Sequence, residues 1–165
     1  NKYSVKSFIN TDTILNKNIS SYTLSKKQFV DWLKLFSKFL NCYNVKLEHF
    51  YGPKDNNNKF IINNICRLLR YEDKIEFTKG FQKRDFIYIE DVVNVNLWLL
   101  DKINIQGIFN CGTGLAHTFN NVAESVISFH KHGEIKYIPM NESLIGKYQS
   151  YTQADISDLL KLGYD

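Results

Sequence analysis

The sequence predicts a mixed α/β domain in which helices cover the faces of a sheet. Segments with the period of a strand alternate along the chain with segments whose apolar residues recur at helical spacing, and this alternation is typical of layered α/β folds. The chain has 165 residues, of which 44% are hydrophobic. That is enough to form one domain with an apolar core.

The first predicted unit is a strand followed by a long helix. Residues 4–10 have the pattern of a short strand, which we expect to end in a polar loop at residues 11–13. Apolar side chains then repeat at helical spacing as far as Leu40, and Ser20 or Ser21 can cap this helix.

The middle of the chain predicts a second strand and a second helix. Residues 43–49 alternate apolar and polar side chains as a strand does, and the Tyr51-Gly52-Pro53 turn ends it. A helix over residues 60–69 follows a polar loop at residues 54–58. Short strands are expected next, over residues 74–78 and 86–89.

The last part of the chain predicts three further helices. Asp91 is a natural cap for a helix from residue 92 to about residue 100, and Thr118 for a helix that reaches His130-Lys131-His132. Between them, residues 107–111 form a strand that turns at Gly112-Thr113-Gly114. A strand over residues 135–138 and a helix over residues 154–162, stopped by Gly163, complete the chain.

Tyr22 and Lys26 are the clearest indication of chemistry in the sequence. They lie four residues apart at the start of the long helix, so the phenol and the ammonium share one helical face. A cation one turn away favours the phenolate, which can then transfer protons. The alternative is a chance pair, because this spacing occurs in many helices.

Lys83-Arg84-Asp85-Phe86 indicates an anion-binding position. A guanidinium beside a strand can hold a phosphate through two parallel hydrogen bonds, while Asp85 holds the neighbouring loop. A surface ion pair is the alternative. Thr13 offers a hydroxyl at a strand end, where open α/β sheets bind ligands, or it caps the turn there.

Other patterns do not meet the requirements of the sites they resemble. Gly112-Thr113-Gly114 is followed by His117 where a dinucleotide-binding loop has its third glycine, and Asp55-Asn56-Asn57-Asn58 lacks the glycine and glutamate of a calcium loop. His130 and His132 face different sides of a helix end. We therefore expect no metal site.

Composition indicates which kinds of partner the protein binds and in which cellular compartment it works. The net charge of +4 is spread along the chain, which argues against a nucleic-acid surface. No apolar run has the length of a membrane span, so no membrane partner is expected. The three cysteines have no paired spacing, and no signal peptide is present. A reducing cytoplasm fits best.

Several landmarks occur in the order found in the extended short-chain dehydrogenase/reductase family of nucleotide-sugar enzymes, which the chain resembles. They are the hydroxyl at Thr13, the Tyr22-x-x-x-Lys26 pair, the Tyr51-Gly52-Pro53 turn, the segment from Lys83 to Val92, and the segment from Gly107 to Gly114. Residues 84–165 are similar to ADP-glyceromanno-heptose 6-epimerases, as in the run from Lys147 to Asp155. Residues 8–91 instead look like reductases that make CDP-dideoxyhexoses such as abequose or paratose.

The resemblance implies a role for each candidate site residue. Tyr22 is the expected acid/base, Lys26 favours its phenolate and holds the nicotinamide ribose, and Thr13 orients the sugar hydroxyl. Phe50 is expected to contact the cofactor, which is NAD or NADP. The residues expected to contact the nucleotide-sugar substrate are His49, Arg84 and Tyr148.

One position departs from the heptose epimerases. Those enzymes carry a second catalytic lysine in the loop after Tyr-Gly-Pro, whereas this chain aligns Asn58 there and has Lys59 one place later. Epimerisation of a heptose needs a proton from either face of the sugar, so this position bears directly on the reaction.

The resemblance also implies how the chain is divided. Residues 1–53 are expected to form part of a Rossmann-like NAD(P)-binding fold, and residues 54–165 mostly the small α/β substrate-binding domain, with some strands and helices returning to the Rossmann part. The glycine-rich half is expected to be absent, as in the carboxy-terminal portion of a longer enzyme. Without it the sheet exposes an edge and an apolar face, and we expect poor stability unless a partner supplies the missing strands.

The expected activity is that of an NAD(P)-dependent nucleotide-sugar epimerase or reductase in the synthesis of bacterial surface polysaccharide, most like the heptose 6-epimerases. A homo-oligomer is expected for the full-length enzyme. Two alternatives remain at this stage. One is a non-catalytic remnant that keeps the nucleotide-sugar cleft but cannot bind the dinucleotide, and the other is a CDP-dideoxyhexose reductase.

Overall fold

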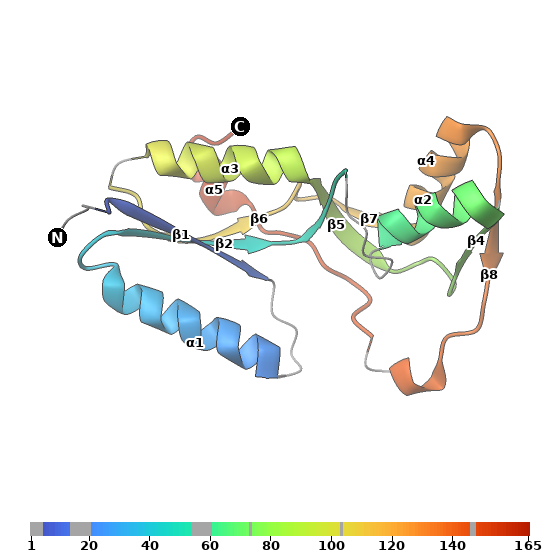
Figure 1. Cartoon of the computed structure of the whole chain (residues 1–165), viewed down its shortest axis with the longest axis horizontal. Helices are drawn as coiled ribbons and strands as arrows, with labels where there is room; N and C mark the ends of the chain where they lie inside the picture. The colour runs from blue at the N-terminus through green and yellow to red at the C-terminus, as the bar shows by residue number, and fades with distance from the viewer. Residues whose placement is uncertain (1–4, 14–20, 54–60, 73, 103, 146–147) are drawn as a thin grey trace.

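The computed structural model describes residues 5–13, 21–53, 61–72, 74–102, 104–145 and 148–165. Its elements gather in two groups along the long axis of the molecule (Figure 1). One group contains both the first strand and the last helix, so the chain leaves this group and returns to it. The fold is mixed α/β, as the sequence predicts.

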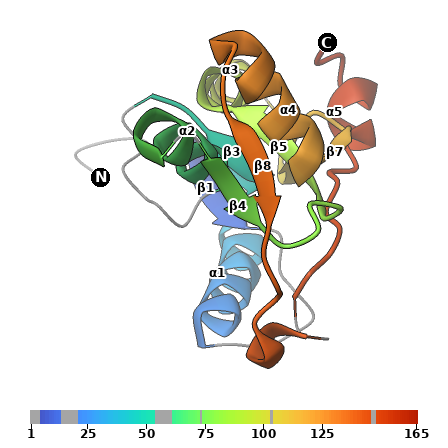
Figure 2. The same cartoon turned by 90° about the vertical axis from the view of Figure 1, so that its right-hand side faces the viewer.

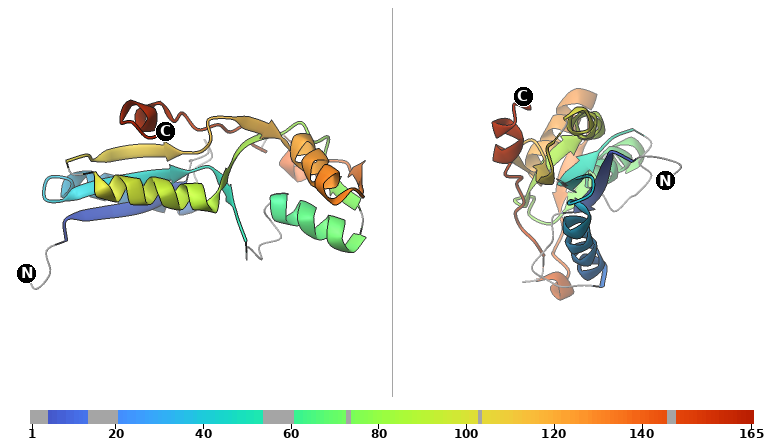
Figure 3. Two further views of the ribbon diagram at one scale, coloured as in Figure 1. Left: turned by 90° about the horizontal axis from the view of Figure 1, so that it is seen from above. Right: turned by 90° about the vertical axis from the view of Figure 1, so that its left-hand side faces the viewer.

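The first group is built on a parallel sheet of three strands. β1 (Ser7–Thr13), β2 (Asn41–Leu47) and β6 (Gly107–Cys111) lie side by side in the order β1-β2-β6 (Figure 3). The register pairs Thr13 with Leu47 and Leu47 with Cys111. The carboxyl ends of the three strands therefore meet at one edge, which is the edge where open α/β sheets bind ligands.

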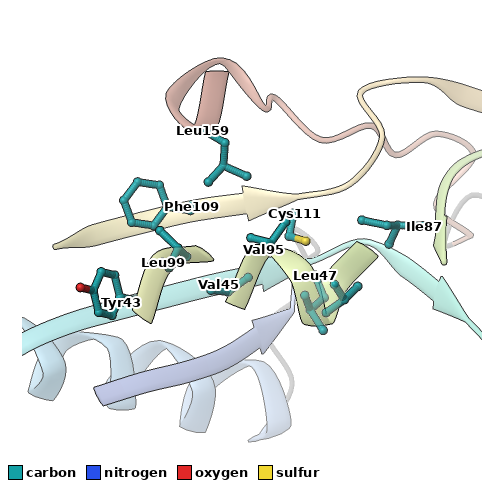
Figure 4. Packing of buried hydrophobic residues seen from close by; sticks show 10 residues of the cluster. Tyr43, Val45, Leu47, Ile87, Val95, Leu99, Phe109, Cys111 and Leu159 are labelled. Atoms are coloured by element: carbon teal, nitrogen blue, oxygen red, sulfur yellow. The ribbon is translucent and has the colours of Figure 1, made fainter. Parts of the chain in front are cut away.

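Helices cover both faces of this sheet. α1 (Ser21–Phe36) lies on one face, and α3 (Ile89–Asp101) with α5 (Ser157–Lys161) on the other (Figures 1 and 3). The α3 face holds the main core, in which β2 and β6 present apolar side chains to α3 and α5 (Figure 4). Its buried members are Tyr43, Val45, Leu47, Ile87, Val92, Val95, Leu99, Phe109, Cys111 and Leu159.

The second group contains two small sheets and two helices. β3 (His49–Tyr51), β5 (Lys83–Tyr88) and β7 (Ala116–Thr118) form one sheet in the order β3-β5-β7, and β4 (Lys74–Phe77) pairs with β8 (Glu134–Tyr137) in the other. α2 (Ile61–Glu72) and α4 (Phe119–His130) pack beside the β4-β8 pair (Figure 2). The second core joins them and consists of Ile65, Ile75, Phe77, Phe119 and Ala123.

Several elements confirm the sequence predictions. β6 covers the predicted residues 107–111. Thr118 caps α4 as expected: its hydroxyl oxygen accepts a hydrogen bond from the backbone N–H of Asn121, and the Asn121 side chain accepts one from the backbone N–H of Thr118. This reciprocal pair is a capping box, which satisfies donors that a helix start leaves free.

Other elements differ from the predictions. Residues 11–13 are the end of β1 rather than a polar loop, because the pairing with residues 45–47 continues to Thr13. The expected strand over residues 43–49 is interrupted at Glu48, whose backbone N–H bonds to the Cys111 carbonyl and ends the β2 ladder. Asp91 is no cap, since α3 begins at Ile89 and Tyr88 is its N-cap.

The helix ends also shift. α1 ends at Phe36 instead of Leu40, and α5 covers only residues 157–161. β7 and a short 3-10 helix over Glu142–Leu144 have no counterpart in the prediction. The predictions for Ser20, for the loop at residues 54–58, and for Lys59 and Lys147 lie outside the described residues. The division into residues 1–53 and 54–165 stays a prediction.

No helix within the described ranges combines the length and apolar character that a membrane span requires.

Candidate active site

The first candidate residue, Thr13, ends β1 at the ligand-binding edge of the sheet. Its backbone N–H donates to the Asp12 carboxylate over 2.8 Å. The Asp12 side chain is buried and also accepts a hydrogen bond of 3.2 Å from the Asn44 amide, which in turn accepts one of 2.6 Å from Asn10. This polar row across β1 and β2 fixes the backbone that carries the Thr13 hydroxyl.

Tyr22 and Lys26 lie in the first two turns of α1, the helix that follows β1 along the chain. The Lys26 ammonium donates to the Thr11 carbonyl over 3.1 Å and lies 5.9 Å from the centroid of the Tyr22 ring. Tyr22 is 57% exposed. The structure therefore brings Thr13, Tyr22 and Lys26 into one region and leaves the phenol accessible.

His49 and Phe50 begin β3, one residue after β2 ends. The Nδ1 atom of His49 lies 3.8 Å from a carboxylate oxygen of Glu48, whose side chain is buried. The His49 ring packs edge-on against Phe86, with 6.2 Å between ring centroids, while Phe50 is exposed. Both candidate residues thus lie where the chain passes from the β1-β2-β6 sheet to the β3-β5-β7 sheet.

Arg84 is buried on β5, where it is only 4% exposed. Its Nη1 donates to the Lys83 carbonyl over 2.8 Å, and its Nη2 donates to the Gln149 carbonyl. The guanidinium carbon lies 5.7 Å from the Phe119 ring centroid and 5.4 Å from that of Tyr148. Burial lowers the pKa of Arg84, while Tyr148 and Glu48 act in the opposite direction.

A continuous series of side chains links the three residues expected to contact substrate. The His49 ring meets Phe86, and the Phe86 ring lies 6.3 Å from Phe119. Phe119 then contacts Arg84, which contacts Tyr148. His49, Arg84 and Tyr148 are 99 residues apart at their extremes, 148 minus 49 in the numbering, yet the fold places them along one side of β5.

Sequence reasoning missed several members of this series. Phe86 and Phe119 appear in the sequence as ordinary core residues, since Phe119 simply opens the helix that Thr118 caps. The Gln149 carbonyl is a backbone group, which no residue pattern reveals. Glu48 could have been noticed, because a glutamate between Leu47 and His49 breaks the apolar alternation of a buried strand.

These observations define a class of protein: an α/β fold with a tyrosine–lysine pair at the carboxyl edge of a parallel sheet and a buried arginine beside the adjoining sheet. The chain belongs to the NAD dependent epimerase/dehydratase family, and the model of that family matches residues 4–112. The predicted family and fold class are confirmed. The description of the family also agrees with the predicted nicotinamide cofactor and specifies NAD.

One curated relative extends the comparison toward the carboxyl end. The ADP-L-glycero-D-manno-heptose-6-epimerase of Alkalilimnicola ehrlichii is 40% identical over 159 residues, which cover 89% of this chain and 50% of the relative. The chain therefore spans half the length of this relative. The similarity to heptose epimerases is confirmed, whereas the resemblance of residues 8–91 to CDP-dideoxyhexose reductases stays an interpretation.

Solved structures of the same kind share the fold. UDP-glucose 4-epimerase of Thermotoga maritima, solved with UDP-glucose, has a TM-score of 0.81 and 24% identity, with coverage of 99% of this chain and 59% of that one. The heptose epimerase of Helicobacter pylori has a TM-score of 0.80 and 20% identity, with coverage of 96% of this chain and 54% of that one. UDP-glucose 4-epimerase of Thermus thermophilus, in complex with NAD, has a TM-score of 0.77 and 18% identity, with coverage of 99% of this chain and 60% of that one.

Proposed function

We propose that this chain supplies the proton-transfer group and the diphosphate-binding residues of an NAD-dependent epimerase that acts on a nucleotide-sugar. The observation that carries the proposal is the position of both groups around the ligand-binding edge of the fold. Thr13 ends β1, and Lys26, which lies next to Tyr22, bonds to the Thr11 carbonyl of the same strand, while Arg84 on β5 contacts Tyr148. A nucleotide-sugar carries a reacting sugar hydroxyl and a diphosphate, and the two groups match these two parts.

The tyrosine–lysine end has the features that proton transfer requires. The exposed Tyr22 phenol exchanges a proton with a sugar hydroxyl that Thr13 orients. Lys26 uses one of its three N–H donors on the Thr11 carbonyl, which leaves two for a ribose. Tyr22, Lys26 and the exposed Phe50 hold the nicotinamide, which supplies hydride chemistry when bound.

The arginine end has the features that diphosphate binding requires. A guanidinium has five N–H donors, and the Lys83 and Gln149 carbonyls accept from two of its nitrogens. The remaining donors can bind phosphate oxygens, and the Phe119 and Tyr148 rings both contact the guanidinium. Because Arg84 is largely removed from water, its attraction for an anion is screened less than it would be at the surface.

The particular reaction is epimerisation at the sugar of an ADP-heptose, in the synthesis of a bacterial surface polysaccharide. The 40% identity to a heptose epimerase supports this choice. Asn58 and Lys59, which bear on the second proton-transfer position, lie outside the described residues.

Turnover by the protein expressed from its complete gene tests the proposal. With NAD bound, it should interconvert the two C6 epimers of an ADP-heptose, and Arg84→Gln should raise KM about tenfold or more, as loss of a charged phosphate contact does. The matched control is Arg70→Gln, because Arg70 is exposed on α2. Diphosphate binding without turnover on ADP-, CDP- or UDP-sugars would instead identify a binding module.

We also propose that the protein is cytoplasmic and homo-oligomeric. All three cysteines are free, which suits a reducing compartment. At the carboxyl end of α1 and in the turn after it, four neighbouring large apolar side chains are exposed, and such clusters mark contact surfaces. They are Trp32, Leu35, Phe36 and Phe39. Sedimentation velocity should give a larger species for the wild type than for Trp32→Glu, and cell fractionation should recover the protein in the cytoplasm.

A further inference from the structure

Residues 148–154, here called the strap, run alongside the start of β5, where Tyr151 pairs in parallel with Lys83, and they carry Tyr148. The strap is joined to β5 by backbone hydrogen bonds, of 2.9 Å from the Lys83 N–H to the Ser150 carbonyl and of 3.1 Å from the Thr152 N–H to the Lys83 carbonyl. Near its start, the Gln149 carbonyl accepts from Arg84 and the Tyr148 ring stacks on the same guanidinium. The geometry of the arginine site therefore depends on where the strap lies.

Asp85 holds the other end of the strap. Its carboxylate is fully buried. One oxygen accepts from the Thr113 backbone N–H over 2.8 Å and from the Thr113 hydroxyl over 2.7 Å. The other accepts from the Gly114 N–H over 2.9 Å and from the Ala154 N–H over 3.1 Å. A single side chain thus joins β5, the turn after β6 and the strap.

The contacts around this carboxylate are close. A Cβ atom placed on Gly112 would lie 2.6 Å from the Ala154 Cβ and 2.6 Å from an Asp85 carboxylate oxygen, so only glycine fits there. The Gln153 side-chain amide also donates to the Gly114 carbonyl over 2.6 Å. The turn and the strap are therefore in close contact at Gly112, Ala154 and Asp85.

Neighbouring residues of a strand point to opposite faces. Arg84 faces Phe119 and Tyr148, while Asp85 faces the turn and Ala154. The strap passes from one face to the other, so fixing Ala154 on the Asp85 face limits the positions open to Tyr148 and Gln149 on the Arg84 face.

We propose that Asp85 is a positioning residue for the nucleotide-sugar. By holding the strap and the turn, it keeps the Gln149 carbonyl and the Tyr148 ring on Arg84, so that the guanidinium is already oriented when the diphosphate arrives. This inference rests on the proposed function. It assigns Asp85 to substrate affinity and leaves proton transfer to the residues on β1 and α1.

Asp85→Asn tests the inference in the protein expressed from its complete gene. The amide keeps the shape of the carboxylate but turns one acceptor into a donor, which then faces N–H or O–H donors. We expect KM for the nucleotide-sugar to rise about tenfold or more while kcat changes less than about threefold. Pyrophosphate, which lacks base and sugar, should bind more weakly by a similar factor in calorimetry.

Asp158→Asn is the matched control, because it makes the same chemical change in an exposed carboxylate that forms a surface ion pair with Lys161. Thr113→Val removes the hydroxyl donor and keeps the backbone donor, and Gly112→Ala pushes on Ala154 from the turn. Both should raise KM in the same direction, and they replace Asp85→Asn as the test should that variant fail to fold.

The outcomes separate this inference from the proposed function. A wild-type protein without turnover on any nucleotide-sugar refutes the function. An active wild type in which Arg84→Gln raises KM, but folded Asp85→Asn does not, overturns the role of Asp85 alone. A loss of kcat at unchanged KM in Asp85→Asn also overturns the positioning role of Asp85. If Asp85→Asn does not fold, a KM equal to that of the wild type in both Thr113→Val and Gly112→Ala overturns the positioning role of Asp85.

Discussion

The Lys26 ammonium donates a hydrogen bond of 3.1 Å to the main-chain carbonyl of Thr11. Thr11 lies two residues before Thr13 on β1, so this bond ties the start of α1 to the strand end that carries the candidate hydroxyl. The Tyr22-x-x-x-Lys26 spacing therefore does more than align two side chains on a helix. It sets the phenol at a defined place relative to the edge of the sheet.

Tyr22→Phe should abolish turnover in the protein expressed from its complete gene. Only the phenolic hydroxyl is lost, so kcat should fall by several orders of magnitude, about 10²–10⁴-fold or more, while the nucleotide-sugar still binds. Steady-state kinetics with calorimetric binding of the substrate measures both quantities.

Tyr137→Phe is the matched control for this experiment. The Tyr137 hydroxyl makes only a long hydrogen bond of 3.3 Å with Asn120, on the exposed side of β8. It should leave kcat unchanged. Near-normal turnover of Tyr22→Phe would rule out Tyr22 as the acid/base.

Cys111 should make stability fall at alkaline pH. Burial, together with the nearby Asp85 and Asp91 charges, raises the pKa of its thiol to about 12. Because the folded state binds this proton more tightly than the unfolded state, the contribution is complete below the pKa of an unfolded thiol, about 8.5, and is lost as pH rises toward 12.

The variant Cys111→Ala isolates this contribution. Urea denaturation of both proteins between pH 7 and pH 10.5 gives the difference in unfolding free energy at each pH, which removes the effect of Tyr164, whose pKa burial also raises. The advantage of the wild type should shrink above the pKa of a free thiol. A difference that stays constant over this range would contradict the prediction.

Leu99→Ala should destabilise the main core. Leu99 is 0% exposed and packs in the cluster between α3 and the β1-β2-β6 sheet, so truncation leaves a cavity that costs about 2–5 kcal/mol. Leu97→Ala, on the same helix but 55% exposed, should cost less than about 0.5 kcal/mol. Chemical denaturation compares them, and equal losses would show that the α3 face is not the core.

Thr118→Ala should weaken α4 through its capping box. The variant leaves the Asn121 N–H without its partner, which costs about 1 kcal/mol for a typical N-cap. Thr118→Ser keeps the hydroxyl and should retain most of the stability. If serine and alanine variants unfold at the same urea concentration, the cap contributes nothing.

The fold could be predicted well where local rules decide the structure. The pattern at residues 107–111 predicts a strand, which β6 confirms, and Thr118 opens α4 through contacts within four residues. Prediction failed where distant partners decide. Residues 11–13 are polar, yet β2 continues their ladder. Glu48 interrupts the predicted strand because pairing with β6 ends at Leu47 and pairing with β5 begins at His49.

In the candidate site, too, local spacing could be predicted from the sequence, whereas contacts between distant residues could not. Tyr22 and Lys26 could be paired from the sequence because helical geometry fixes four-residue neighbours. Arg84 and Tyr148 are 64 residues apart, 148 minus 84 in the numbering, and only the strap brings them into contact. Resemblance to a family singled out both residues. No pattern in the chain indicates that Phe119 completes the contact on the other side.

Glu48 is the single residue between β2 and β3, and its backbone lies at the point where the chain passes from one sheet to the other. Because side chains alternate along a strand, inserting one residue here would exchange the faces that His49 and Phe50 occupy against β5. Deleting it would have the same effect. The one-residue length of this connection therefore fixes which side chains of β3 face each side of the second sheet, so an insertion is tolerated better in the exposed loops than here.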